Sequence, residues 1–475
     1  MRDRLNVPAS GESSLSFRLE SEPHELAALY HDEDHFVFLD SSRVGSDQGR
    51  FSTLAWSPEA VFRSKGFRID IRRSGLWRRV AGDPMEELQR LLSERDDSAD
   101  GELAGGAIGY LGYDLFRVFE HYDGLSSVDD LALPDSCLAF FDTILVFDHD
   151  RKSWSVTGRN PELFETKIRE ILARVQSPRP PADFSAPASA GIRSESNMSR
   201  EQYLRSVERV LDHIAAGDIY QLNLSQRFSR PLTVAPFDVF TTLRGVSPSF
   251  YGAYLNCGDH IVISSSPELF LRRRGDMIET RPIKGTRPRG RTPEEDRAFE
   301  SELLDSEKEK AELAMIVDLE RNDLGRICAY GAVEVSDRRY IDRLPTLLHT
   351  VAAVRGRLRP DVTAVDILRA TFPGGSISGC PKIRAIEIID SLEPNWRHVY
   401  TGAIGFIGFN GEMILNIAIR TLLATGGRIY YQVGGGIVAD SIPDAEFSET
   451  LQKAAAIETA IATAESSHRT GRAAR

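Results

Sequence analysis

The sequence predicts an α+β fold built from large, mainly antiparallel sheets. Strand patterns dominate the chain, and the predicted helices are scattered among them instead of alternating with single strands. A doubly wound parallel sheet needs regular alternation, so this order argues against one. With 475 residues and 41% hydrophobic content, the chain is long enough to bury a large core.

The first 175 residues are read mainly as short strands. Apolar runs and period-two alternation predict strands at 36–39, 67–77, 105–113, 136–150 and 153–157. Apolar residues at helical spacing predict helices at 84–93 and 161–175. Residues 1–16 and 465–475 are small and polar and are expected to be disordered tails, which leaves 17–175 as an N-terminal region.

A Pro/Ala/Ser-rich linker is predicted at 176–197, followed by a second region at 198–464. Its first helix starts at Ser199, with Gln202 completing a capping box, and stops at Gly217. Further helices are expected at 237–244, 365–371, 382–390 and 445–464. Strands are expected at 251–255, 260–264, 332–337, 347–354, 400–409, 413–423 and 429–436, the last three as neighbours in one sheet.

Composition excludes several function classes. A net charge of -12 and a pI near 5.5 argue against general binding to nucleic acid or an anionic membrane. The four cysteines show no C-x-x-C spacing and no disulfide framework. The N-terminus lacks a signal-peptide core, and there is no run of 18 apolar residues, so we expect a cytoplasmic protein.

The stretch from 264 to 325 concentrates the polar chemistry. Glu268 follows a strand, Lys284 lies in a Gly/Pro-rich turn, and a helix opens at Ser306 with Glu309 and Glu312 one turn apart. The two glutamates continue the apolar face of that helix. A half-buried carboxylate pair is costly without a cation, although acids also suit a first helical turn by themselves.

The closing helix repeats the pattern. Glu446, Glu449 and Lys453 lie at i, i+3 and i+7. One interpretation is a simple exposed Glu449–Lys453 pair, worth a few tenths of a kcal/mol. The other is that both helices supply carboxylates to a hard ion such as Mg²⁺, which prefers oxygen ligands and leaves room for water and substrate.

Lys284 is surrounded in sequence by four arginines, and two interpretations stay open. It belongs either to a solvated basic loop or to a site in which neighbouring cations and burial lower the pKa and make the amine nucleophilic. The backbone of Gly285 and Thr286 could bind a carboxylate, as could the glycines 434–436. Arg420, in an apolar strand, needs an anionic partner, whereas His349 is more typical of a hydrogen-bonded core histidine.

Several motifs resemble those of the chorismate-utilising enzymes, which include anthranilate synthase component I, aminodeoxychorismate synthase component I, isochorismate synthase and salicylate synthase. The resemblance is dense over about 199–462 and looser before it. The motifs are S-S-S-P-E at 264–268, P-I-K-G-T-R-P-R-G at 282–290, D-S-E-K-E-K-A-E at 305–312, F-P-G-G-S-I-S-G-C-P-K at 372–382 and G-G-G-I-V-A-D-S at 434–441.

Two positions distinguish members of the family. Lys284 stands where anthranilate synthases have alanine, and it resembles the lysine of aminodeoxychorismate synthases. Gln221 stands where the members that use water carry a lysine base. The resemblance therefore implies amination of chorismate at C4. The alternatives are anthranilate synthase component I, aminodeoxyisochorismate synthase, and an inactive metabolite-binding scaffold.

The resemblance also implies the fold and the roles of individual residues. It implies large, mainly antiparallel sheets packed as a sandwich with helices outside. Lys284 would form a covalent adduct with chorismate and Glu268 would act as general acid and base. Mg²⁺ would be held by Glu312 and Glu449, with Glu309 and Glu446 close by. The residues expected to bind substrate are Gly285, Thr286, His349, Tyr400, Arg420, Gly434, Gly435, Gly436 and Lys453.

A partner protein is implied as well. No cysteine lies in a G-x-C-x-G elbow of the kind that glutamine-hydrolysing enzymes use. Ammonia is therefore expected from a separate glutamine amidotransferase subunit, with chorismate and Mg²⁺ as the small-molecule partners.

Overall fold

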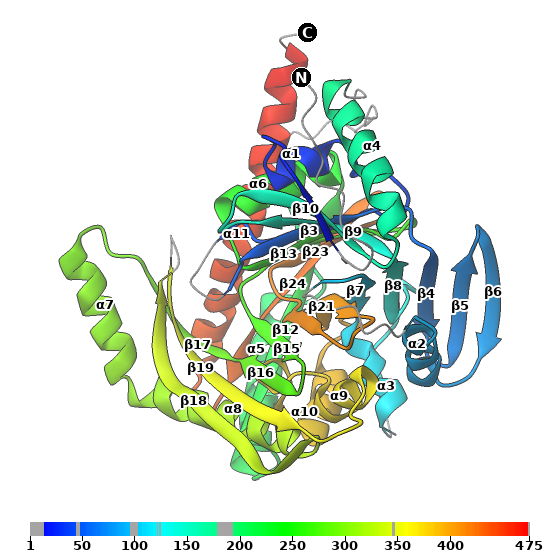
Figure 1. Ribbon diagram of the computed structural model, residues 1–475. Helices are drawn as coiled ribbons and strands as arrows, with labels where there is room; N and C mark the ends of the chain where they lie inside the picture. Colours follow the sequence, from blue (N-terminus) through cyan, green and yellow to red (C-terminus); the bar gives the residue numbers. More distant parts are fainter. Residues whose placement is uncertain are drawn as a thin grey trace.

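The computed structural model describes residues 14–43, 48–95, 103–120, 122, 125–177, 193–343 and 347–473. Within these residues the chain forms two sheets of 12 strands each, and all of the strand pairs in both are antiparallel (Figure 1). No described helix has both the length and the apolar composition needed to cross a membrane.

The first sheet joins strands from both halves of the chain. Its order is β1 (Ser14–Phe17), β10 (Ser153–Gly158), β9 (Thr143–Asp148), β3 (Phe51–Ala55), β2 (Val37–Asp40), β13 (Tyr251–Asn256), β14 (Ile261–Ser266), β23 (Thr421–Thr425), β24 (Arg428–Ile437), β12 (Gln221–Pro231) and β11 (Glu195–Ser196), with β20 (Gly379–Cys380) also paired to β12.

The second sheet is equally mixed in sequence. Its order is β17 (Ile283–Pro288), β19 (Leu347–Leu358), β16 (Met277–Arg281), β15 (Leu269–Arg274), β22 (Met413–Ile417), β21 (Ala403–Gly408), β7 (Gly106–Leu111), β8 (Ser136–Phe141), β4 (Ala60–Lys65), β5 (Arg68–Arg73) and β6 (Leu76–Ala81), with β18 (Cys328–Arg343) on the other side of β19.

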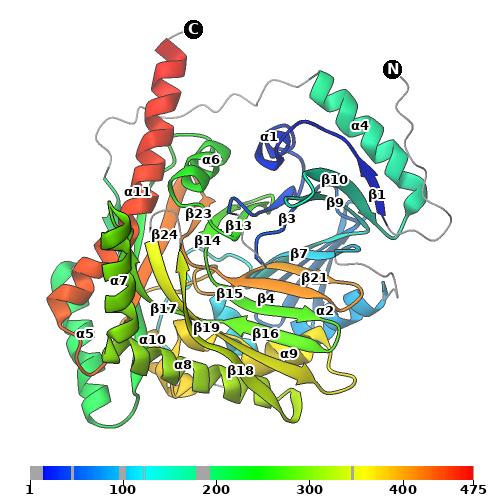
Figure 2. The same ribbon diagram turned by 60° about the vertical axis from the view of Figure 1, so that its left-hand side comes forward.

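The helices lie outside the sheets (Figure 2). They are α1 (Pro23–Ala28), α2 (Pro84–Ser93), α3 (Phe116–Phe119), α4 (Phe164–Gln176), α5 (Arg200–Ala215), α6 (Pro236–Val246), α7 (Pro293–Asp305), α8 (Glu307–Gly325), α9 (Ala364–Thr371), α10 (Lys382–Leu392) and α11 (Pro443–Ala473), with short 3₁₀ turns at Tyr113–Leu115, Pro161–Leu163 and Gly375–Ile377.

Four apolar clusters account for this architecture. One lies between the sheets and contains residues of both, such as Val262 and Leu423 from the first and Ile108 and Phe406 from the second. Two others fill the outer faces, one under α1, α4, α6 and α11 and one under α2, α8 and α9. A fourth joins α5 and α10 to β12. The predicted α+β sandwich with external helices is confirmed.

Several predicted boundaries are wrong at the ends of the chain. The N-terminal tail was predicted to reach residue 16, but Ser14–Phe17 pairs with β10. The C-terminal tail was predicted from 465, but α11 continues to Ala473. Its Glu465 is buried and pairs with the buried Arg230 at 2.6 Å, which explains why the helix does not stop there.

The predicted linker and the last strands also differ from the structure. Most of the linker, 178–192, lies outside the described residues, while Glu195–Ser196 pairs with β12 as a short strand. The last strands were predicted to share one sheet. Instead β21 and β22 belong to the second sheet and β23 and β24 to the first. Both sheets bury apolar residues, so the pattern did not show where the chain crosses between them.

Candidate active site

The site lies where two chain segments pass from one sheet to the other. β14 ends at Ser266 and β15 begins at Leu269, so Glu268 lies at the first crossing. β22 ends at Ile417 and β23 begins at Thr421, so Arg420 lies at the second. The crossings are adjacent, because the Ile417 N–H donates to the Glu268 carbonyl at 3.1 Å. The prediction that Arg420 lies inside a strand is therefore wrong, because Arg420 lies in a bend and has a φ of 50°.

Lys284 lies on a strand and not in the predicted turn. β17 pairs with β19, and its register shifts between Lys284 and Thr286. Gly285 between them has φ +74°, which allows this bulge without strain. A Cβ added to Gly436 of the neighbouring sheet would lie 3.3 Å from Lys284 Nζ. Lys284 therefore faces the glycines of β24.

Burial lowers the pKa of Lys284 below its ordinary 10.5; Glu312 opposes this shift, and Lys453 adds to it. Three of the four arginines close in sequence are instead paired with acids. Arg287 binds Glu309 at 2.9 Å, and the other pairs are Arg289 with Asp296 and Arg281 with Glu279. The predicted lowering of the Lys284 pKa is present, but its cause is desolvation and Lys453, not the neighbouring arginines.

Glu268 is a buried carboxylic acid whose charge interacts with that of Lys284. The Ser376 hydroxyl donates to Glu268 Oε1 at 2.7 Å. Burial raises the pKa of Glu268, and the Ser376 hydrogen bond and the charge of Lys284 act against this. Glu268 therefore tends to hold a proton more strongly than an exposed glutamate, while remaining within electrostatic reach of the amine.

Helix α8 carries Glu309 and Glu312 toward the same region. The Ser306 hydroxyl caps the helix by accepting from Glu309 N–H at 3.3 Å. The Glu309 side chain does not complete a capping box; it binds Arg287, while its Oε2 is buried and has no hydrogen bond within the described part of the chain. Burial raises the pKa of Glu312, and the nearby Lys284 and Lys308 lower it.

Helix α11 approaches from the first sheet. The predicted Glu449–Lys453 pair is formed, with Oε1 and Nζ 2.7 Å apart, and Lys453 also donates to the Gly434 carbonyl at 2.9 Å. Glu446 accepts from the Ser441 hydroxyl at 2.6 Å. A Cβ on Gly435 would lie 3.4 Å from a Glu446 oxygen and 3.6 Å from a Glu449 oxygen.

The glycines 434–436 lie within β24, in the strand predicted at 429–436. Asn223 and Leu224 of β12 pair with Gly436 and Gly435. The absence of side chains leaves room above this strand for the carboxylates of α11 and the amine of Lys284. The glycines thus form the open floor of the site.

The carboxylates form no complete metal cage. Among the described residues, no group of three or more His, Cys, Asp or Glu side chains is arranged to hold an ion. The charge of Glu449 nevertheless helps to raise the pKa of Glu312, and Glu309 keeps one buried oxygen without a hydrogen-bond partner in the described structure. Mg²⁺ is commonly bound by one or two carboxylates, with water and substrate oxygens completing its shell. The side chains present suit that mode of binding.

A third side of the site contains Thr286, His349 and Arg420. Thr286 Oγ1 lies 2.8 Å from His349 Nδ1 across β17 and β19. Burial, helped by Arg420, lowers the pKa of His349 to about 3, so the ring is neutral. Burial also lowers the pKa of Arg420 to about 10, and no described carboxylate forms an ion pair with it. Arg420 thus remains available for an anionic ligand.

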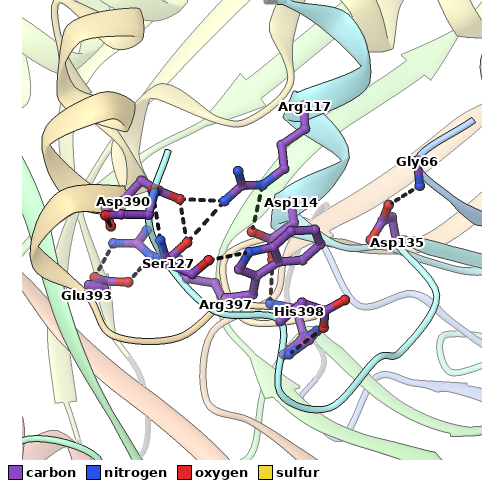
Figure 3. Close-up of polar contacts among 12 residues, drawn as sticks. Gly66, Asp114, Arg117, Ser127, Asp135, Asp390, Glu393, Arg397 and His398 are labelled. Carbon is purple, nitrogen blue, oxygen red and sulfur yellow. Dashed lines mark hydrogen bonds and ion pairs between the residues drawn. The ribbon is translucent and has the colours of Figure 1, made fainter. Parts of the chain in front are cut away.

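Tyr400 lies beside a buried ion pair. Arg397 donates to Glu393 through Nε and Nη2 at 2.8 and 2.7 Å (Figure 3). It also donates to the carbonyls of Asn223 and Ile377 at 2.6 and 3.1 Å. Tyr400 lies with its ring centre 5.8 Å from this guanidinium, and burial raises its pKa to about 12. Arg397 thus links the region of Tyr400 to Asn223, which pairs with Gly436 of the glycine floor.

Some residues of the site did not stand out in the sequence. Ser376 lies within the F-P-G-G-S-I-S-G motif, yet its contact with Glu268 spans 108 residues. Thr350 donates to the Lys284 carbonyl from β19. Gln221 was singled out in the sequence, but its approach to the same Gly436 position as Lys284 was not predicted. No local pattern indicates these contacts, because each depends on strand pairing over a long range.

Comparison with known families decides the class of protein. The family model described as chorismate binding enzyme matches residues 35–459. The chain belongs to this family. The match covers both sheets, so membership of the chorismate binding enzyme family includes the N-terminal region, where the motifs gave only a loose resemblance.

Characterised members resemble the chain along almost their whole length. Aminodeoxychorismate synthase component 1 of Bacillus subtilis is 38% identical over 465 residues, covering 94% of this chain and 96% of the relative. Anthranilate synthase component 1 of Pseudomonas putida is also 38% identical, over 476 residues, covering 97% and 96%. Overall identity therefore does not separate the two reactions.

Solved structures of the chorismate binding enzyme family confirm the fold. Anthranilate synthase component I from Streptococcus pneumoniae superposes with a TM-score of 0.77 at 34% identity, covering 87% of this chain and 93% of that one. MenF, an isochorismate synthase from Escherichia coli, has the same fold with a TM-score of 0.71 at 16% identity, covering 94% of both chains.

Proposed function

We propose that this enzyme aminates chorismate at C4 with ammonia and produces 4-amino-4-deoxychorismate, a precursor of 4-aminobenzoate and folate. The observation that carries the proposal is Lys284, an amine with a pKa lowered by burial that faces the Gly434–Gly436 floor and the carboxylates of α8 and α11. Anthranilate synthases have alanine at this position, so they lack an amine that could act as a nucleophile there.

Lys284 would divide one difficult displacement into two steps. Its neutral Nζ forms a bond to C2 of the ring, the two ring double bonds shift, and the C4–O bond breaks. Glu268 supplies the proton with which the hydroxyl leaves as water. Ammonia then forms a bond at C4, the double bonds shift back, and the C2–Nζ bond breaks. The proton lost by the incoming nitrogen returns to Glu268.

The remaining residues would bind and orient the substrate. Arg420, Thr286 and the backbone of Gly285 would bind one carboxylate, with His349 fixing the Thr286 hydroxyl. Lys453 and Tyr400 would contact other oxygens above the glycine floor. Glu312 and Glu449 would hold Mg²⁺, with Glu309 and Glu446 beside them. When bound, the ion would neutralise carboxylate charge and orient the ring.

The relatives support a separate source of ammonia. The relatives from Bacillus subtilis and Pseudomonas putida are each named component 1 of a synthase, and the name implies a second component. We propose that a glutamine amidotransferase subunit supplies ammonia to this chain.

The identity of the product tests the proposal. Purified protein is incubated with chorismate, Mg²⁺ and ammonium, and the products are separated by liquid chromatography with mass detection. We expect 4-amino-4-deoxychorismate. Anthranilate would contradict the proposal and assign the chain to the other branch of the family. Mg²⁺-dependent binding of chorismate without any turnover would instead indicate an inactive scaffold.

A further inference from the structure

A second buried carboxyl group lies behind Glu268. Glu320, on the inner face of α8, is only 2% exposed. Its Oε1 accepts from the Gly375 N–H at 3.1 Å. Its Oε2 is buried and has no hydrogen-bond partner among the residues that the structure describes. An unsatisfied buried oxygen is costly, so its retention points to a role beyond packing.

The hydrogen bond to Gly375 connects Glu320 to the general acid. Gly375 begins the 3₁₀ turn Gly375–Ile377, and the next residue, Ser376, donates to Glu268 Oε1 at 2.7 Å. The turn is packed closely on α8, since a Cβ on Gly375 would lie 3.0 Å from Glu320 Oε1. Movement of Glu320 would therefore displace the hydroxyl that orients Glu268.

Three charged groups face Glu320. Asp323 is on the same helix, Lys382 begins α10 and binds Asp323 at 2.5 Å, and Glu268 lies across the turn. Burial, helped by the charges of Asp323 and Glu268 and opposed by Lys382, raises the pKa of Glu320 to about 8. Beyond Asp323 and Lys382 an open groove of about 720 Å³ reaches solvent, so a proton can exchange on that side.

We infer that Glu320 is a positioning residue for Glu268, holding the Gly375–Ser376 turn in place and setting, by its own charge, how strong an acid Glu268 is. This inference rests on the proposed function, in which Glu268 gives a proton to the leaving hydroxyl. When Glu320 is neutral, the Glu268 carboxylate formed in that step is not repelled. When Glu320 is ionised, like-charge repulsion disfavours that carboxylate, and proton donation slows.

The pH profile of turnover tests the inference. In the native enzyme, turnover should fall as the pH rises past the pKa of Glu320. Glu320→Gln keeps the shape and the acceptor for Gly375 but cannot ionise, so this loss at high pH should disappear while turnover at neutral pH is retained. Glu320→Ala removes the acceptor, and kcat should fall roughly tenfold or more with little change in KM, because a slightly misplaced general acid loses much of its effect.

Asp318→Asn is the matched control, because Asp318 lies on the exposed side of the same helix and pairs with Arg321. It should leave the profile unchanged. An unchanged loss at high pH in Glu320→Gln, or native kcat in Glu320→Ala, would overturn the inference. Glu268→Gln distinguishes a failure of the proposed function from a failure of the role inferred for Glu320. If that variant keeps native turnover, the proposed function itself fails, whereas an inactive Glu268→Gln beside a native-like Glu320→Ala refutes only the role of Glu320.

Discussion

The chemistry proposed for Lys284 depends on its surroundings more than on its identity. An exposed lysine is almost fully charged at neutral pH and is not nucleophilic. At position 284, burial shifts the equilibrium toward the neutral amine, and Lys453 acts in the same direction. The carboxylates Glu312 and Glu268 limit the shift, so the amine retains some positive charge with which to attract an anionic substrate.

This balance predicts the pH dependence of adduct formation. Because only the neutral amine reacts, the rate of reaction with chorismate in the absence of ammonia should rise with pH, with a midpoint below 10.5, until the ionisation of Glu320 slows proton donation by Glu268. Lys453→Gln removes a neighbouring cation, which should raise the pKa of Lys284 and move the midpoint to higher pH. Stopped-flow or quench kinetics across the pH range measures both midpoints. Equal midpoints in the two proteins would show that Lys453 does not tune the amine.

At the scale of elements, two helices that pack on different sheets, α8 and α11, bring their glutamates close to the Gly434–Gly436 stretch of β24. α8 packs against β17 and β19, and α11 packs against β24, so the relative position of the two helices depends on the sandwich itself. The sequence showed that each helix carries Glu-x-x-Glu near its start. That the two pairs approach each other could not be derived from periodicity, because it depends on contacts between distant elements.

Because α8 and α11 each supply a glutamate to the proposed metal site, mutation of these glutamates should weaken metal-dependent binding. Glu312→Gln and Glu449→Gln should each weaken the Mg²⁺-dependent binding of chorismate by tenfold or more, about 1.4 kcal/mol, because each removes one anionic ligand. Glu307→Gln is the control, since Glu307 lies in the first turn of α8, is exposed and, among the residues that the structure describes, pairs only with Lys310. Titration calorimetry with and without Mg²⁺ measures the effect. Equal affinities for chorismate in all of these proteins would show that Glu312 and Glu449 do not bind the metal.

Element boundaries were predicted well where the signal is local. The Ser199–Gln202 capping box is present, and the helix at 84–93 has the predicted bounds. Predictions failed where a backbone feature interrupts an apolar pattern. Gly285 allows a strand to continue through a sequence that looks like a turn, and the bend at Arg420 breaks a run that looks like one strand.

At the scale of the whole molecule, the two halves of the sequence form one body. β2 of the N-terminal region pairs with β13, and β7 pairs with β21, so each sheet needs both regions. The sequence divided the chain into an N-terminal region at 17–175 and a catalytic region at 198–464, without showing which strands of the two regions pair. The residues that position the site, such as Ser376 behind Glu268, depend on this joint architecture, which explains why long-range contacts escaped prediction.

The positions of the four cysteines predict which nitrogen source the chain can use by itself. The chain alone should turn over chorismate with ammonium but not with glutamine, because three of its four cysteines are buried and Cys380 is not in a nucleophile elbow. Addition of a glutamine amidotransferase subunit should then allow glutamine to replace ammonium. Product formation with each nitrogen source, in the native protein and in Cys380→Ser, measures this. Turnover of glutamine by the isolated chain would contradict the requirement for a partner.

The most direct test of the account is the mass of the protein after reaction with chorismate and Mg²⁺ in the absence of ammonia. We expect a species heavier by one chorismate less one water, with the modification located on Lys284 by peptide mapping, and we expect Lys284→Ala to lack it. The added mass should disappear when ammonium is supplied. If the native protein makes 4-amino-4-deoxychorismate and no such species accumulates, or if Lys284→Ala turns over at the native rate, Lys284 is not the nucleophile.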